Sequence, residues 1–173
     1  MVGECTTMDR SRSRDDRLGR RRPVVMTTYD RLTVGSRFTT PGREISEDVA
    51  SRIVDMAGYT HLMFRDAAYV AESTTFKGRP IPGELSILFL GGLAEQTGVF
   101  DETTLALVSL EGVEFKTPAL IGDTIHLEME VSDKRRSRSG ARGFITFAWT
   151  CRNQRDEIVL TARATLAFRT AES

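Results

Sequence analysis

The chain has 173 residues, of which 40% are hydrophobic and 28% charged, and its 24 basic and 24 acidic side chains cancel to a formal charge of zero. These values are typical of one globular domain with a core of ordinary size, and they give the whole molecule no general attraction for nucleic acid or an anionic membrane surface. No apolar run reaches the roughly 20 residues of a membrane-spanning helix. The two cysteines, Cys5 and Cys151, have neither metal-ligand nor redox spacing, so we expect a cytoplasmic protein without a metal or cofactor.

The first 25 residues differ in composition from the rest of the chain. They hold seven arginines against four acidic residues, a net charge of +3, and no apolar segment. This composition predicts a disordered leader and does not resemble a secretory signal. The leader is either a basic arm that docks a partner or an inert extension upstream of Met26. Residues 26–173 are then expected to form the folded domain.

Short apolar pieces and turn residues over 29–45 predict an edge segment followed by a helix over 46–57. Ser46 is suited to the N-cap and Gly58 to the C-terminal stop of that helix. A second short helix is expected to begin near Asp66 and to run through the sequence AAYVAES.

The segment GELSILFLGGLAEQTG, residues 83–98, predicts a longer helix. Pro80 and Pro82 exclude a helix before Gly83, and Gly98 is a natural stop after it. Apolar side chains occupy most of its circumference, which is typical of a buried helix.

Strands are expected to wrap this helix. Segments 105–118, 123–135, 143–153 and 157–170 have strand character, and 123–135 alternates strictly between apolar and polar residues. The order of helices and long antiparallel strands predicts an α+β domain with one sheet curled around one central helix.

Three sequence segments extend this prediction to a family. The opening YDRLTVGSRFTTPGREISEDV, the segment TTFKGRPIPGEL and the strand-turn-strand segment EFKTPALIGDTIHLEMEV look like segments of MaoC-like proteins and occur in the same order. Over residues 29–170 the chain resembles this family of (R)-specific enoyl-thioester hydratases and 3-hydroxyacyl dehydratases. The resemblance implies a hotdog fold and an acyl thioester substrate carried on CoA or acyl carrier protein.

The catalytic segment of that family usually reads G-D-x-N-P-L-H-x-D, whereas residues 58–66 read GYTHLMFRD. In a gapless alignment Tyr59 replaces the catalytic aspartate, Phe64 the catalytic histidine and His61 the asparagine, while Asp66 keeps the final acid. The usual His-Gly-Met at the start of the central helix is Pro82-Gly83-Glu84. Neither replacement is suited to acid–base work near pH 7, because a phenol has an ordinary pKa near 10 and phenylalanine carries no proton to transfer.

The resemblance leaves thioester recognition possible. It implies that the Gly83 backbone N–H points at the substrate carbonyl, where the N-terminus of a helix suits a developing oxyanion. Gly83, Phe64 and Asp66 are therefore candidate substrate-binding residues, although Asp66 is also suited to capping the next helix.

Three side chains are candidates for a rebuilt catalytic site, namely Tyr59, His61 and Glu84. His61 is either a catalytic imidazole or a hydrogen-bonded structural residue. Glu84 is either a catalytic carboxylate or an acid that favours the first turn of its helix.

Three functions remain open at this stage. The first is an acyl-thioester-binding MaoC-like protein of the dehydratase and hydratase class, which if active is a hydro-lyase. The second is a non-catalytic subunit paired with an intact hotdog partner, and the third is a thioesterase, lyase or isomerase that uses His61 or Glu84. The resemblance implies a homodimer or a heterodimer in each case. The net charge and the lack of a long apolar run favour neither nucleic acid nor membrane partners.

Overall fold

The computed structural model describes residues 28–100 and 102–171. The leader predicted for residues 1–25 lies outside this part of the chain. Within it, no helix combines the length and apolar character needed to cross a membrane.

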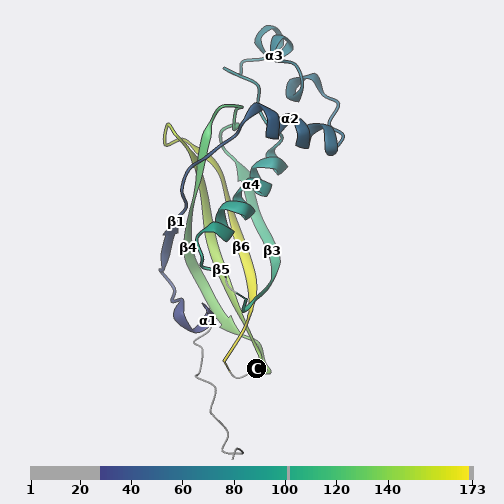
Figure 1. The fold of residues 1–173 in the computed structure, drawn as a ribbon. Coiled ribbons are helices and arrows are strands. Elements are labelled where there is room, and N and C mark those ends of the chain that lie inside the picture. Colours follow the sequence, from purple (N-terminus) through teal and green to yellow (C-terminus); the bar gives the residue numbers. More distant parts are fainter. Residues whose placement is uncertain (1–27, 101, 172–173) are drawn as a thin grey trace, which may run out of the picture.

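All the described helices precede the long strands in the chain. They are α1 (Thr28–Arg31), α2 (Glu47–Met56), the short 3-10 helix η1 (Leu62–Phe64), α3 (Ala67–Ser73) and the 14-residue α4 (Gly83–Gln96). The bounds of α2 and α4 differ by at most two residues from those of the predicted helices 46–57 and 83–98. Figure 1 shows α2 and α3 beyond one end of the sheet, with α2 next to the beginning of α4, which crosses the sheet diagonally.

The strands form one antiparallel sheet in the order β1-β4-β5-β6-β3, and β2 also pairs with β4. The strands are β1 (Arg37–Thr39), β2 (Arg43–Glu44), β3 (Thr104–Phe115), β4 (Thr124–Arg136), β5 (Arg142–Asn153) and β6 (Ile158–Arg169). The alternation predicted for 123–135 is confirmed, because Ile125, Leu127 and Met129 are buried while the residues between them are half-buried. β3 is an edge strand, and β6 is its only partner among the described strands.

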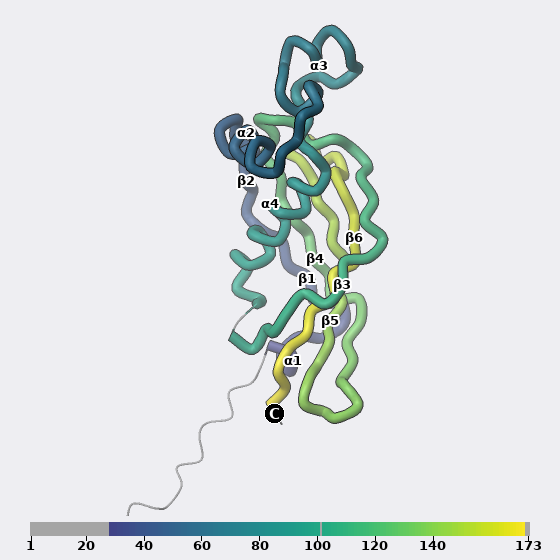
Figure 2. Tube along the Cα trace, turned by 90° about the vertical axis from the view of Figure 1, so that its right-hand side faces the viewer, coloured from purple at the N-terminus to yellow at the C-terminus, as the bar shows by residue number. Residues whose placement is uncertain are grey.

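The core lies between α4 and the concave face of this sheet. Leu85, Phe89 and Leu93 face it from α4, one helical turn apart, and meet buried residues of β4 and β5 such as Phe147. The view in Figure 2 shows α4 running along one side of the strands. The predicted α+β architecture, an antiparallel sheet curled around a long helix, is confirmed.

The burial of α4 is less complete than its composition predicts. Leu88 points away from the sheet and is 58% exposed, and Gly91 and Gly92 are half-buried. The reason is geometric: a single curled sheet covers one side of the helix, and on the other side Leu88 borders a hollow that it shares with Ile53 and Val54 of α2.

Candidate active site

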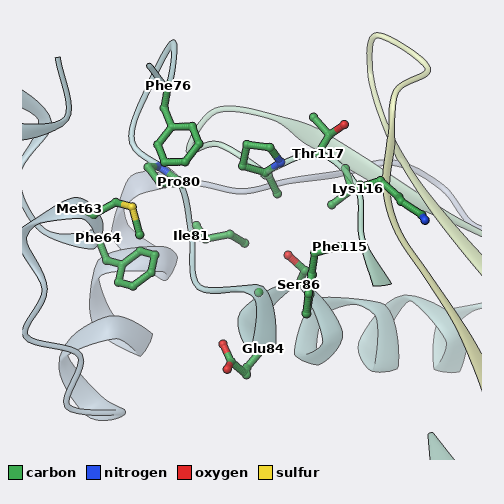
Figure 3. A pocket seen from close by; sticks show the side chains of 14 residues that line it. Met63, Phe64, Phe76, Pro80, Ile81, Glu84, Ser86, Phe115, Lys116 and Thr117 are labelled. Atoms are coloured by element: carbon green, nitrogen blue, oxygen red, sulfur yellow. The ribbon is translucent and has the colours of Figure 1, made fainter. Parts of the chain in front are cut away.

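A cavity of about 400 Å³ opens at the N-terminal end of α4. Met63 and Phe64 of η1 form one side of it, and Phe115 and Pro118, from the end of β3 and the turn that follows, form another. Pro80 and Ile81 lie between these two sides, and the first turn of α4 closes the base (Figure 3). Its walls are therefore mostly apolar, as expected for a site that accepts an apolar ligand group.

Gly83 begins α4 at the base of this cavity. A Cβ atom at this position would lie 2.7 Å from the Phe115 ring, so β3 approaches the helix closely here and a side chain would have to displace that ring. As the first residue of the helix, Gly83 has a backbone N–H without an intrahelical acceptor, and no other described carbonyl accepts it. The cavity thus presents a free backbone donor at the positive end of the helix dipole.

Ser86, one turn further along α4, also lines the cavity. Its side chain is 98% buried, with 2% exposed. Sequence reasoning missed this residue. The sequence does place a small polar residue three positions after Gly83 in an otherwise apolar stretch. Many serines in helices have no binding role, so this position alone did not indicate a ligand contact.

Tyr59 and Glu84 are brought together by the loop after α2. The Tyr59 hydroxyl donates a hydrogen bond of 3.1 Å to Oε2 of Glu84 in the first turn of α4. The pKa of Tyr59 is raised above 10 by desolvation and then by the hydrogen bond to the Glu84 carboxylate and its charge. Tyr59 is therefore a neutral phenol at pH 7, and Glu84 is occupied as an acceptor.

Phe64 connects the same loop to the cavity. Its ring packs edge-on against the Tyr59 ring with 5.5 Å between centroids, and it also lines the cavity. Arg65 holds the loop in place by donating to the Tyr59 carbonyl at 2.8 Å and to the Asp55 carboxylate. The two aromatic rings therefore lie beside the beginning of α4.

His61 and Asp66 have local roles in the structure. Nδ1 of His61 accepts the Met63 N–H at 3.0 Å at the start of η1, and its side chain is not part of the cavity wall. Asp66 accepts the N–H groups of Ala68 and Tyr69 at 2.8 and 3.1 Å and so caps α3, as expected for its position. The structure thus brings Tyr59, Phe64, Gly83 and Glu84 together and leaves His61 and Asp66 at neighbouring helix ends.

Few ionisable groups reach the cavity. Among the described residues that line it, only Glu84 and Lys116 carry a charge, and Lys116 pairs with Glu114. The described residues contain no group of three side chains arranged to hold a metal ion. The cavity offers backbone and hydroxyl donors in apolar surroundings, without a free acid–base pair.

Comparison with known proteins identifies the fold. No protein-family model matches the sequence, and no curated protein matches it. Among solved structures, a monoamine oxidase regulatory protein from an Archaeoglobus species is 24% identical, with a TM-score of 0.75 over 82% of this chain and 94% of that one. A MaoC-like dehydratase from Rhodospirillum rubrum is 23% identical, with a TM-score of 0.70 over 82% and 95%. An R-hydratase from Pseudomonas aeruginosa is 24% identical, with a TM-score of 0.64 over 82% and 85%.

A further similar structure, a Mycobacterium tuberculosis protein, is described as a double hotdog. This chain spans 44% of that protein, at 21% identity and a TM-score of 0.72. The fold of this chain is therefore a single hotdog, the fold of MaoC-like dehydratases and R-hydratases.

Proposed function

We propose that this chain is a MaoC-like protein that binds an acyl thioester, carried on CoA or acyl carrier protein, in the cavity at the beginning of α4. The apolar walls would hold the acyl chain, and the thioester carbonyl would accept the Gly83 N–H. The fold shared with a MaoC-like dehydratase and an R-hydratase supports this substrate class.

One observation carries the proposal: a mostly apolar cavity ends on a backbone N–H that no described group accepts. A donor at a helix N-terminus stabilises negative charge on a carbonyl oxygen and needs no side chain to do so. Substitutions in the loop after α2 therefore leave this part of the site intact.

The same site is poorly equipped for hydration. Adding water to an enoyl thioester requires a base to polarise the water and an acid to protonate the α-carbon, and each such group contributes roughly 10²–10⁴-fold. Tyr59 is a hydrogen-bonded phenol with a raised pKa, and Phe64 has no proton to exchange. We therefore propose that the protein belongs to the dehydratase and hydratase class, binds thioesters and has strongly reduced hydro-lyase activity.

A second candidate is the non-catalytic subunit of a heteromeric hydratase or dehydratase. The observation that favours it is the apolar surface of the edge strand β3, where Leu105, Leu107 and Val108 are exposed, together with Leu88 on the uncovered side of α4. Exposed edge strands and apolar patches are commonly covered by another chain. A second hotdog subunit, identical or different, would bury both surfaces and supply the missing acid and base if it is intact.

Calorimetric titration of the purified protein with butyryl-CoA and with free CoA tests the binding proposal. We expect butyryl-CoA to bind at least tenfold more tightly, since burying a four-carbon chain adds about 0.8 kcal/mol for each methylene group. Equal affinities for the two ligands, or no binding of either, would refute it. Light scattering and co-purification separate the two candidates: an isolated homodimer supports the first, and recovery with an intact hotdog partner supports the second.

A further inference from the structure

Positive charge gathers at the end of the molecule that lies opposite the cavity. This end comprises α1, the residues before β3, the hairpin between β4 and β5 and the last residue of β6, and Figure 1 shows α1 at the end of the sheet opposite α2 and α3. It carries seven basic side chains against three acidic ones, a net charge of +4: Arg31, Lys134, Arg135, Arg136, Arg138, Arg142 and Arg169 against Asp30, Glu102 and Asp133.

The neutral total of the whole chain conceals this separation of charge. Residues 1–25, which lie outside the described part and precede α1 in the chain, add a further +3. Because the formal charge of the chain is zero, the remaining residues carry −7. An argument from net charge alone gives no reason to expect an anionic partner, whereas the distribution of charge gives one for this end.

Three of the arginines share the convex face of the sheet. Arg142 of β5 and Arg169 of β6 are direct cross-strand partners, and Arg135 of β4 is the partner of Phe144, two residues beyond Arg142. Residues two apart on a strand point to the same face, so the three guanidinium groups gather on one side of the sheet. Gly143 lies between them in sequence and faces the other side, where α1 packs on it.

These three guanidinium groups have no carboxylate partner in the described part of the chain. Arg135 lies over the Phe144 ring, 4.3 Å from its centroid, and Arg169 donates to the Glu102 carbonyl at 3.3 Å. Like charges directly opposite each other on neighbouring strands are destabilising. A pair such as Arg142 and Arg169 therefore costs stability in the free protein, and an external anion would compensate for it.

The form of the surface indicates which kind of anion. The arginines line the face of three strands and continue to Arg138, which lies exposed with Ser139 at the tip of the hairpin, so the surface suits an extended polyanion. Arginine forks bind phosphate oxygens in bidentate fashion, and hydroxyl groups add contacts to phosphates. Residues 133–144 present no exposed large apolar side chain that could enter a bilayer or form the centre of a protein interface.

We propose that this end of the molecule binds the phosphate backbone of a nucleic acid through Arg135, Arg142 and Arg169. The contacts are electrostatic and do not read the base sequence. The surface lies at the other end of the fold from the cavity, so this inference goes beyond thioester binding and does not depend on it.

Fluorescence anisotropy of the full chain with a labelled single-stranded RNA of about 20 nucleotides tests the proposal. Three phosphate contacts should lower the affinity at least tenfold between about 50 and 200 mM salt, because each contact releases condensed counterions. The variant Arg135→Gln/Arg142→Gln/Arg169→Gln should bind at least tenfold more weakly at about 50 mM salt and lose most of the salt dependence. Its stability to heat should not fall, since the substitutions remove repulsion between neighbouring strands.

The matched control is Arg37→Gln/Arg52→Gln/Arg163→Gln, which removes the same charge from exposed arginines elsewhere on the fold. It should bind within about twofold of wild type, because a patch and not the net charge attracts the RNA. Equal losses in the two triple variants, or no binding by wild type at about 50 mM salt, would overturn the proposal. Binding to vesicles that contain phosphatidylserine without binding to RNA would overturn it in favour of a membrane surface. If the first variant does not fold, the wild-type salt dependence and the vesicle comparison decide.

Discussion

Two clusters of polar groups in this molecule differ in whether their hydrogen bonds are completed within the chain. Directly before β4, the buried Asp123 carboxylate accepts the Leu120 N–H at 2.9 Å and, from the turn between β5 and β6, the Gln154 amide at 2.8 Å and the Arg155 guanidinium at 2.9 Å. At the beginning of α4, no described group accepts the Gly83 N–H, and the Ser86 hydroxyl lies with it on the cavity wall.

The difference separates groups that stabilise the fold from groups that are available to a ligand. Asp123 is 3% exposed and would be costly to bury as a charge without those donors. The donors at α4 face a cavity large enough for an acyl group, so their hydrogen bonds can be completed from outside. Substitutions in the first cluster should therefore reduce stability, and substitutions in the second should reduce binding.

The largest expected effect is a gain of activity. The double variant Tyr59→Asp/Phe64→His places a carboxylate and an imidazole where the two rings now lie, and we expect crotonyl-CoA hydration to rise at least 10²-fold. A spectrophotometric assay of enoyl-CoA loss measures it. Each single variant should gain less, because the reaction needs both groups. A double variant no faster than wild type would mean that the loop does not place these positions at the reacting carbons.

Asp123→Asn tests the first cluster. It removes charge-assisted hydrogen bonds from a buried site, and we expect the free energy of unfolding at pH 7 to fall by about 2–3 kcal/mol. Urea denaturation measures this loss. Asp133→Asn, on an exposed part of β4, should have little effect, and a comparable loss in that control would contradict the assignment.

The same carboxylate predicts a pH dependence. Burial alone would raise the pKa of Asp123, but the hydrogen bonds from Arg155, Leu120 and Gln154 outweigh it and hold the pKa below the ordinary value. A depressed pKa in the folded state stabilises the protein above the unfolded-state pKa, near 4, and this contribution is lost as the pH falls through the folded-state value. The difference between wild type and Asp123→Asn should therefore shrink below about pH 4. A difference that is constant down to pH 2 would show that the carboxylate is not the cause.

Gly83→Ala tests the second cluster. The new methyl group would meet the end of the half-exposed Phe115 ring, which can rotate toward the cavity mouth, so we expect a small change in stability. Affinity for butyryl-CoA should fall about tenfold as the approach to the N–H is obstructed. Gly91→Ala is the control, since a Cβ there meets no atom within 4 Å. Equal affinities in wild type and Gly83→Ala would remove Gly83 from the proposed site.

The smallest effect concerns the titration of Tyr59. Glu84→Gln removes the neighbouring charge, so the pKa of Tyr59 should move down toward its ordinary value, although desolvation keeps part of the increase. Ultraviolet titration of both proteins, each compared with its own Tyr59→Phe variant so that the Tyr59 phenolate signal is isolated by difference, measures this. An unchanged Tyr59 pKa would show that Glu84 does not contact it in solution.

The fold could be predicted from sequence because its signals are local. Proline and glycine mark the ends of α4, and strict alternation over 123–135 identifies the buried face of β4. Asp66 was expected at the start of a helix because capping depends on the adjacent N–H groups, and it caps α3. The exposure of Leu88 could not be predicted, because it depends on how much of the helix the curled sheet covers.

The site was less accessible to sequence reasoning because its contacts are long-range. The Tyr59–Glu84 hydrogen bond joins residues 25 positions apart, and nothing local indicates it. The exclusion of His61 from the cavity wall and the burial of Ser86 likewise depend on where the loop and β3 lie relative to α4. Residue type alone favoured His61 as a catalytic candidate and gave no reason to choose Ser86.

The most direct test of the account is the rate at which the purified wild-type protein hydrates crotonyl-CoA at saturating concentration. Since Tyr59 stays protonated at pH 7 and so cannot serve as the base, and Phe64 has no proton to give, we predict turnover at least 10²-fold below the 1–10³ s⁻¹ that is typical of enzymes. Turnover within that range by the isolated chain would contradict the central claim that this hotdog site recognises a thioester without its own acid–base pair.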